Sequence, residues 1–157
     1  MKMKSIKRSI DINCDNEFIF ELTQNYSLRL EWDKYLSKAY LLNGATEPSV
    51  GVYAYCKNNN GSSMISEYIS YQPSKVAAIS MKQGPIILKK FSGSWTVKKL
   101  GGTLSTLTFT YHFSLKGGFL GKLVQPIANY YFSKDMSKRL MAFKYYAEKN
   151  IKTIQQT

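Results

Sequence analysis

The residues that could carry acid, base or metal chemistry are few and far apart in this sequence. The chain has one histidine, His112, and two cysteines, Cys14 and Cys56. A nucleophile requires a base beside it, and a zinc site requires three or four ligands. His112 alternates with Tyr111 and Phe113 in a predicted strand, so we expect its side chain to face solvent. The sequence therefore predicts no catalytic residue, no metal site and no cofactor.

The glycines do not form a phosphate-binding loop. Gly84-Pro85 and Gly101-Gly102 are turns between predicted strands, and neither opens a helix whose N-terminus would hold a phosphate. No stretch reaches the roughly 18 apolar residues of a membrane span, and the basic start lacks the apolar region of a signal peptide. With two thiols expected to be reduced, these features favour a cytoplasmic location.

Two charged residues share a strand face with apolar neighbours. Arg8 lies between Ile6 and Ile10 in the alternation, and Glu67 is placed in the same way in its own strand. A charge turned inward costs free energy unless it is paired or hydrogen-bonded. In one interpretation these charges reach solvent or pair across the sheet. In the other they are polar anchors that orient a ligand oxygen in an apolar cavity.

Residues 116–122 place Phe119 and Leu120 among glycines and between two lysines. In one interpretation the segment is a hinge whose Phe119 packs into the core. In the other it is an entrance flap that touches an anionic membrane surface, where each lysine contributes about 1 kcal/mol and buried apolar groups add to this. Pro126 then either kinks the following helix or marks its start.

The hydrophobic pattern places these residues on strands and one long helix. Alternation predicts a first strand at residues 4–12, and Asp15 and Ser27 are predicted N-caps of two short helices, the second of which reaches Leu36. Turns such as Asn60-Gly61 separate five to six further strands up to residue 115. From about residue 120 to 149 apolar residues recur at helical steps. The predicted core stripe of this helix is Leu123, Ile127, Tyr131, Met136, Leu140, Phe143 and Ala147.

Composition fits one domain with an aromatic interior. A chain of 157 residues can bury about 70% of its unfolded surface. Its 12 Tyr and 8 Phe predict either an aromatic-rich core or a cavity lined with rings. The net charge of +12 favours an anionic partner, namely nucleic acid, a lipid headgroup surface or an acidic protein. The lysines are spread along the chain with no run longer than two, which equally fits an ordinary soluble surface.

Taken together, this order of elements and several short motifs resemble the START-like superfamily, which includes polyketide cyclases, coenzyme Q-binding proteins and lipid-transport proteins. The motifs are Glu31-Trp32-Asp33, Tyr40-Leu41-Leu42-Asn43-Gly44, Tyr71-Gln72-Pro73-Ser74-Lys75-Val76, Gly93-Ser94-Trp95, Gly101-Gly102-Thr103, Gly118-Phe119-Leu120-Gly121 before Pro126, and Ala147-Glu148. The resemblance implies an α+β helix-grip fold, in which a curved antiparallel sheet of six to seven strands, with two short helices after the first strand, surrounds a long C-terminal helix. It further implies one ligand-binding domain over residues 1–157.

The resemblance also implies an internal cavity for a hydrophobic small molecule. The expected ligand-binding residues are Arg8, Glu67, Trp95, Phe109, Tyr111, Phe113, Ile127, Tyr131 and Leu140, with Phe119 and Leu120 at the entrance or a membrane. The leading hypothesis is a carrier or sensor of a lipid, quinone or polyketide-like ligand, with peripheral contact to an anionic membrane. One alternative is a polyketide cyclase or dehydratase-type enzyme. The other is a protein that uses its basic surface to bind a macromolecule such as nucleic acid or the ribosome.

Overall fold

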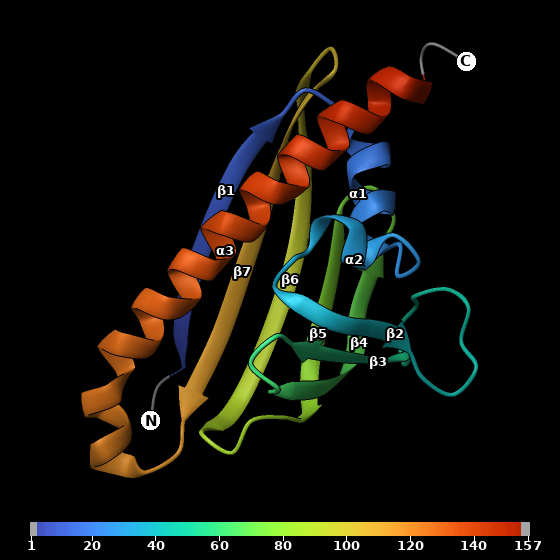
Figure 1. Cartoon of the computed structure of the whole chain (residues 1–157). Helices are drawn as coiled ribbons and strands as arrows, with labels where there is room; N and C mark the ends of the chain where they lie inside the picture. The colour runs from blue at the N-terminus through green and yellow to red at the C-terminus, as the bar shows by residue number, and fades with distance from the viewer. Residues whose placement is uncertain (1–2, 155–157) are drawn as a thin grey trace.

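Seven antiparallel strands form one curved sheet in the order β1-β7-β6-β5-β4-β3-β2 (Figure 1). The computed structural model describes residues 3–154 and the side chains of residues 3–151, so both ends of the predicted domain, residues 1–2 and 155–157, lie outside it. The strands are β1 Lys4–Ile12, β2 Leu36–Leu41, β3 Tyr53–Asn58, β4 Ser63–Gln72, β5 Val76–Gln83, β6 Leu88–Gly101 and β7 Leu104–Leu115. The predicted α+β architecture and strand number are confirmed.

The two short helices between β1 and β2 begin differently. Asp15 caps α1, Asn16–Gln24, as predicted, because its side chain accepts a hydrogen bond from the Glu17 N–H. The predicted Ser27 cap is wrong: α2 is Arg29–Trp32, and its N-cap, Leu28, makes no side-chain cap bond. The helix also ends before Leu36, which is the first residue of β2.

The long helix α3, Gly118–Ile154, crosses the concave face of the sheet beside β1 and β7 (Figure 1). Pro126 lies inside α3, so the helix does not begin there. Proline has no N–H, and the carbonyl four residues earlier therefore lacks its usual helical partner. Within residues 3–154, no helix combines the length and the hydropathy needed to span a bilayer.

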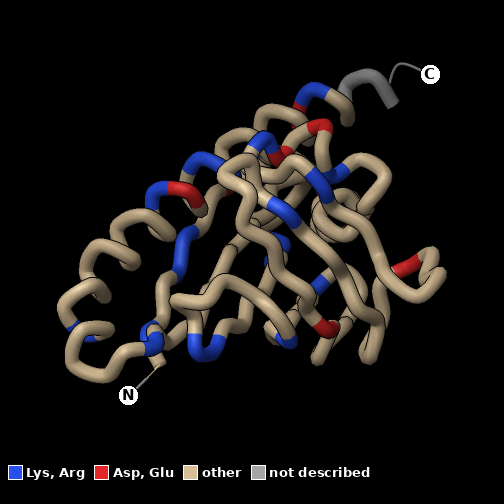
Figure 2. Tube along the Cα trace, turned by 60° about the horizontal axis from the view of Figure 1, so that its bottom comes forward, with Lys and Arg blue, Asp and Glu red and all other residues tan. Residues whose placement is uncertain are grey.

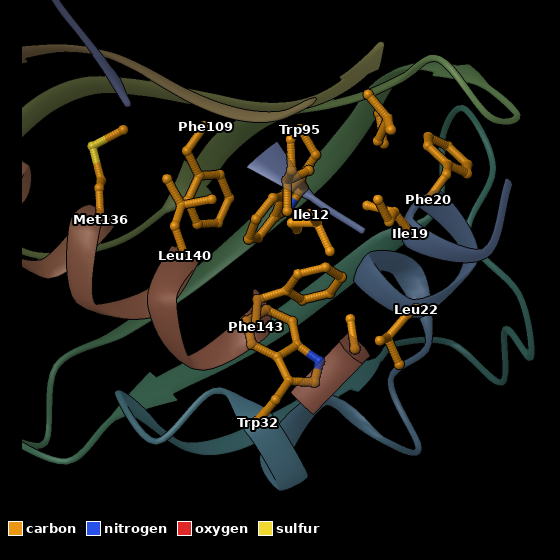
Figure 3. Packing of buried hydrophobic residues seen from close by; sticks show 14 of the residues in the cluster. Ile12, Ile19, Phe20, Leu22, Trp32, Trp95, Phe109, Met136, Leu140 and Phe143 are labelled. Carbon is orange, nitrogen blue, oxygen red and sulfur yellow. The ribbon is translucent and has the colours of Figure 1, made fainter. Parts of the chain in front are cut away.

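The core lies between the sheet and the C-terminal half of α3. Met136, Leu140 and Phe143 are buried on successive turns of α3 and point toward Trp95 and Phe109 of the sheet (Figure 3). Trp32 closes this core from α2, with its ring centroid 4.9 Å from that of Phe143. These contacts fix α2 against α3 and so determine the position of Asp33, the residue that follows α2.

The N-terminal half of α3 turns a different face to the sheet than predicted. Leu123, Ile127 and Tyr131 belong to the predicted core stripe, but they are 59, 57 and 62% exposed. The opposite stripe, on which Ala128 and Phe132 pack against the core, faces the protein. Both sides of this half therefore carry apolar residues, so hydrophobic periodicity could not distinguish the inner face from the outer one.

Candidate ligand-binding site

A cavity of about 350 Å³ lies between the sheet and α3. This volume falls within the usual range of small-molecule sites. Phe91 and Trp95 of β6, Phe109 and Tyr111 of β7, and Phe132 of α3 form an aromatic part of its wall. The ring centroid of Tyr111 lies 5.0 Å from that of Phe91 and 6.0 Å from that of Phe132, both in edge-on contact. Such packing gives a flat ligand large apolar surfaces to contact.

An ionic cluster lies at one part of the wall, around Asp33. This carboxylate is fully buried and accepts hydrogen bonds from Arg29 Nε at 2.9 Å and from Arg139 Nε and Nη2 at 3.0 and 2.7 Å. Arg29 and Asp33 are four residues apart around the end of α2, and Arg139 reaches them from α3. Both arginines line the cavity, whereas Asp33 does not. Asp135, one helical turn before Arg139, also lines it.

The arginines are also held by aromatic rings. The Arg29 guanidinium lies 4.7 Å from the ring centroid of Trp32 and 5.3 Å from that of Trp95. Arg139 lies 5.1 Å from both Tyr35 and Phe109. Cation–π contacts of this kind become stronger where water is excluded. They therefore fix the orientation of both guanidinium groups beside the cavity.

Arg139 also donates a hydrogen bond through Nη1 to the Tyr111 hydroxyl at 2.5 Å. The hydroxyl accepts this bond, so its own proton remains free to donate to another acceptor. Burial raises the pKa of Tyr111 despite the nearby Arg139, so the phenol stays protonated at neutral pH. Burial alone would raise the pKa of Asp33, but Arg139 and Arg29 lower it below its ordinary value. Asp33 is thus a paired anion and Tyr111 is a neutral donor.

A second polar part of the wall is a chain of hydrogen bonds that links Tyr26, Tyr68 and Gln24. The Tyr68 hydroxyl donates to Gln24 Oε1 at 2.8 Å, and the Tyr26 hydroxyl lies 3.0 Å from that of Tyr68. Because Tyr68 uses its only proton on Gln24, Tyr26 must donate to Tyr68. Burial raises the pKa of Tyr26 to about 12 and also raises that of Tyr68. These phenols therefore add polar contacts without adding charge.

The loop between β5 and β6 contributes one exposed residue to the cavity wall. Ile87 lines the cavity and is 52% exposed, whereas the neighbouring wall residues Leu88 and Phe91 are buried. A wall residue with this exposure stands where the wall meets solvent. Ile87 therefore belongs both to the cavity wall and to the protein surface.

The structure brings only some of the predicted ligand-binding residues to the cavity. Trp95, Phe109 and Tyr111 line its wall. Phe113 and Leu140 are buried in the core instead, where Phe113 packs against Phe132 with ring centroids 4.8 Å apart. Ile127 and Tyr131 face outward on α3, for the reason given above. Contact of any of these residues with a ligand stays a prediction.

Neither predicted polar anchor lines the cavity. Glu67 of β4 pairs with Lys82 of the neighbouring strand β5 at 2.5 Å, in an ion pair that is partly exposed. Arg8 of β1 is exposed and donates to the Ser133 hydroxyl of α3 and to the Lys7 carbonyl. Both residues thus fit the interpretation in which these charges reach solvent or pair across the sheet, where a long charged side chain avoids the cost of desolvation.

Three residues that the sequence analysis discussed are exposed at the surface. Phe119 and Leu120 are 73 and 68% exposed, so Phe119 does not pack into the core. His112 is exposed on the outer face of β7. Among the side chains of residues 3–151, no group of three or more His, Cys, Asp or Glu is placed to hold a metal ion.

The ionic cluster was missed by the sequence analysis, although one local signal was present. Arg29 and Asp33 stand four residues apart next to Trp32, in a segment with several apolar residues. Opposite charges at this spacing form a pair on one side of a helix. Arg139 gave no comparable signal, because 106 residues separate it from Asp33.

A curved sheet that grips a long helix around a cavity defines the helix-grip class of α+β proteins. The model of the family described as polyketide cyclase / dehydrase and lipid transport matches residues 3–148, and the chain belongs to this family. A comparison with curated proteins finds no match.

Several solved structures share the fold at low sequence identity. The chain is similar to the Zhui aromatase/cyclase from Streptomyces sp. R1128, with a TM-score of 0.82 and 13% identity over 95% of this chain and 96% of that one. It is also similar to norcoclaurine synthase from Thalictrum flavum, with a TM-score of 0.68 and 12% identity over 92% and 86%. A START superfamily protein from Mycobacterium smegmatis gives 0.66 and 12% over 96% and 98%. These comparisons give no support for a membrane or nucleic acid partner.

Proposed function

We propose that the chain is one START-like domain that binds a hydrophobic small molecule with a polar oxygen, and that it acts as a carrier or sensor of this ligand. The observation that carries the proposal is the cavity of about 350 Å³, where aromatic walls meet the cluster of Asp33, Arg139 and Tyr111. Lipids, quinones and polyketides all combine an apolar body with oxygen atoms. Membership of a family whose description includes lipid transport supports the same proposal.

Binding is favoured over a chemical step because the charged groups of the cluster are already engaged. Both oxygens of Asp33 accept hydrogen bonds from guanidinium groups, and its lowered pKa makes it a weak base. The raised pKa of Tyr111 makes this phenol a weak acid. General acid–base catalysis works best with a pKa near the operating pH, and neither group meets this condition.

A second candidate is an enzyme of the cyclase or dehydratase type. The observation in its favour is that Arg139 donates through Nη1 to the Tyr111 hydroxyl at 2.5 Å, so two donor groups lie side by side on residues that line the cavity. Two donors at one point would stabilise negative charge on a ligand oxygen during an aldol-type ring closure. The third hypothesis, a macromolecule-binding protein, expects a filled core, and the cavity counts against it.

Native mass spectrometry of protein purified from its own host tests the proposal. We expect an adduct with the mass of a small organic molecule, which is released when the protein is denatured. Absence of an adduct, together with no rise in melting temperature with the bicyclic phenol 2-naphthol, would overturn the proposal. Conversion of the released compound to a dehydrated or cyclised product by the purified protein would favour the enzyme. We place this function in the cytoplasm, and the free thiols of Cys14 and Cys56 support that location.

A further inference from the structure

The outward face of the N-terminal half of α3 is a row of exposed apolar side chains. Phe119, Leu120, Leu123 and Ile127 are 73, 68, 59 and 57% exposed. Residues three and four apart share one side of a helix, so these side chains form a continuous stripe. A helix that is apolar on both faces is normally covered on both faces. Within residues 3–154, only the inner face of this half is covered.

The loop between β5 and β6 extends this apolar surface. The Lys116 N–H donates to the Ile87 carbonyl at 2.9 Å, which places the loop beside the start of α3. Ile86 and Ile87 are 88 and 52% exposed. We call the surface of Ile86, Ile87, Phe119, Leu120 and Leu123 the apolar tip. Exposed patches of this kind mark interaction surfaces in monomeric proteins.

The charges around the apolar tip are all positive. The sequence has no Asp or Glu between Glu67 and Asp135, whereas the same stretch contains nine lysines. Four of these lysines, at positions 89, 90, 116 and 122, flank the two segments of the tip. Figure 2 shows no acidic segment on α3 before Asp135. Like charge on two copies with a net charge of +12 each disfavours self-association through this surface.

We propose that the apolar tip docks on the surface of an anionic lipid bilayer. The side chains of Ile86, Phe119, Leu120 and Leu123 enter the boundary between headgroups and acyl chains, while the flanking lysines remain among the headgroups. An anionic layer over an apolar interior matches both the charge and the exposed side chains. Ile87 belongs to the apolar tip and also lines the cavity, so the docked protein places this part of the cavity wall beside the bilayer. Transfer of a ligand between cavity and bilayer rests on the proposed function, but docking does not.

Flotation with vesicles tests the docking surface in the full chain. The vesicles are phosphatidylcholine with and without phosphatidylglycerol, and the variant is Phe119→Ser/Leu120→Ser/Leu123→Ser. Its matched control is Val50→Ser/Ile69→Ser, because these side chains are 63 and 52% exposed outside the tip. We expect wild type and control to bind the anionic vesicles, and the triple variant to bind at least about tenfold more weakly. Raising the salt should weaken binding, since screening limits charge interactions to about 8 Å at physiological ionic strength.

Failure of wild type to bind anionic vesicles, or equal binding by the triple variant, would overturn the proposal. A wild-type dimer that dissociates in the triple variant would also overturn it, because the tip would then contact a second copy. If the triple variant does not fold, Phe119→Trp gives an independent test by quenching with brominated lipids, with Ile69→Trp as the unquenched control. Tyr111→Phe alters the cavity alone and should dock as wild type does, which separates failure of docking from failure of ligand binding.

Discussion

Replacing Asp33 by Asn removes the one carboxylate that two buried arginines share. The side chain keeps its size, but Arg29 and Arg139 lose the anion that accepts their three hydrogen bonds at 2.7–3.0 Å. The side chains of these arginines are 9 and 11% exposed, so water does little to replace the lost partner. Removing one member of a buried ion pair costs about 3–5 kcal/mol, because it leaves uncompensated buried charge. Typical domains have unfolding free energies of about 5–15 kcal/mol, so we expect a large loss.

Urea unfolding followed by tryptophan fluorescence measures this loss. Trp32 and Trp95 both contact Arg29, so their emission reports on the region that the substitution changes. The matched control is Asp15→Asn, which removes an exposed ion pair with Lys99 and should leave stability near that of wild type. A cost below about 1 kcal/mol for Asp33→Asn, the range of an exposed pair, would refute the reasoning.

A variant that replaces Arg29, Asp33 and Arg139 together by apolar residues of similar volume separates stability from function. Buried ionic clusters replaced in this way are often as stable as the original or more stable. We therefore expect a folded protein with near wild-type stability and a weaker preference for oxygen-bearing ligands, because the Tyr111 hydroxyl loses the arginine that orients it. If this variant keeps the wild-type preference for oxygen-bearing ligands, the cluster does not select them.

Three further predictions concern acid, ligand and thiol chemistry. The pKa of Asp33 is lower in the folded protein than in the unfolded chain, where it is about 3.9, so ionised Asp33 stabilises the fold at pH values above 3.9. This stability is lost as the pH falls through the pKa of the folded state. Urea unfolding at a series of pH values should therefore show a weaker loss of stability with acid in Asp33→Asn than in wild type. Phe132→Ala should reduce the rise in melting temperature that 2-naphthol produces, while His112→Ala on the outer face should not; equal shifts in both variants would count against the cavity. Burial raises the pKa of Cys14 to about 11, so its thiol should react with Ellman's reagent at pH 8 only as fast as the protein opens, and a rate like that of free cysteine would contradict its burial.

The elements with clear periodicity could be predicted from the sequence. Alternation in residues 4–12 matches β1 as observed, and the N-cap function of Asp15 was correct. The alternation that predicts a strand at residues 103–115 also corresponds to β7, Leu104–Leu115. These segments follow local rules, because one face is buried and the other meets solvent.

The strand β2 could not be predicted, because tertiary pairing decides it. Its sequence, Leu36 to Leu41, shows little apolar alternation, and its register against β3 is irregular between Leu36 and Lys38. The strand stands at the edge of the sheet and pairs only with β3. A similar lack of local signal explains why the wrong face of the N-terminal half of α3 was predicted to be buried, because both sides of this half carry apolar residues.

The candidate site was predictable in its aromatic part and not in its ionic part. Phe109 and Tyr111 are two residues apart in β7, whose apolar and polar residues alternate clearly, so the pattern predicted that both lie on the inner face of the sheet. Arg139 joins Asp33 only because α3 crosses the sheet next to α2, which is a long-range contact that no spacing encodes. Arg8 and Glu67, which alternation made candidate anchors, do not line the cavity and bond to other residues.

Isothermal titration calorimetry with two bicyclic probes tests most directly whether the cavity binds a hydrophobic ligand through a polar oxygen. The probes are 2-methoxynaphthalene and 2-ethylnaphthalene, which have nearly the same shape but differ in the oxygen that can accept a hydrogen bond from Tyr111. We predict that wild type prefers 2-methoxynaphthalene by about 0.5–1.5 kcal/mol, the net worth of one hydrogen bond, and that Tyr111→Phe reduces this preference. Equal affinities of wild type for the two probes, or a preference that Tyr111→Phe leaves unchanged, would contradict it.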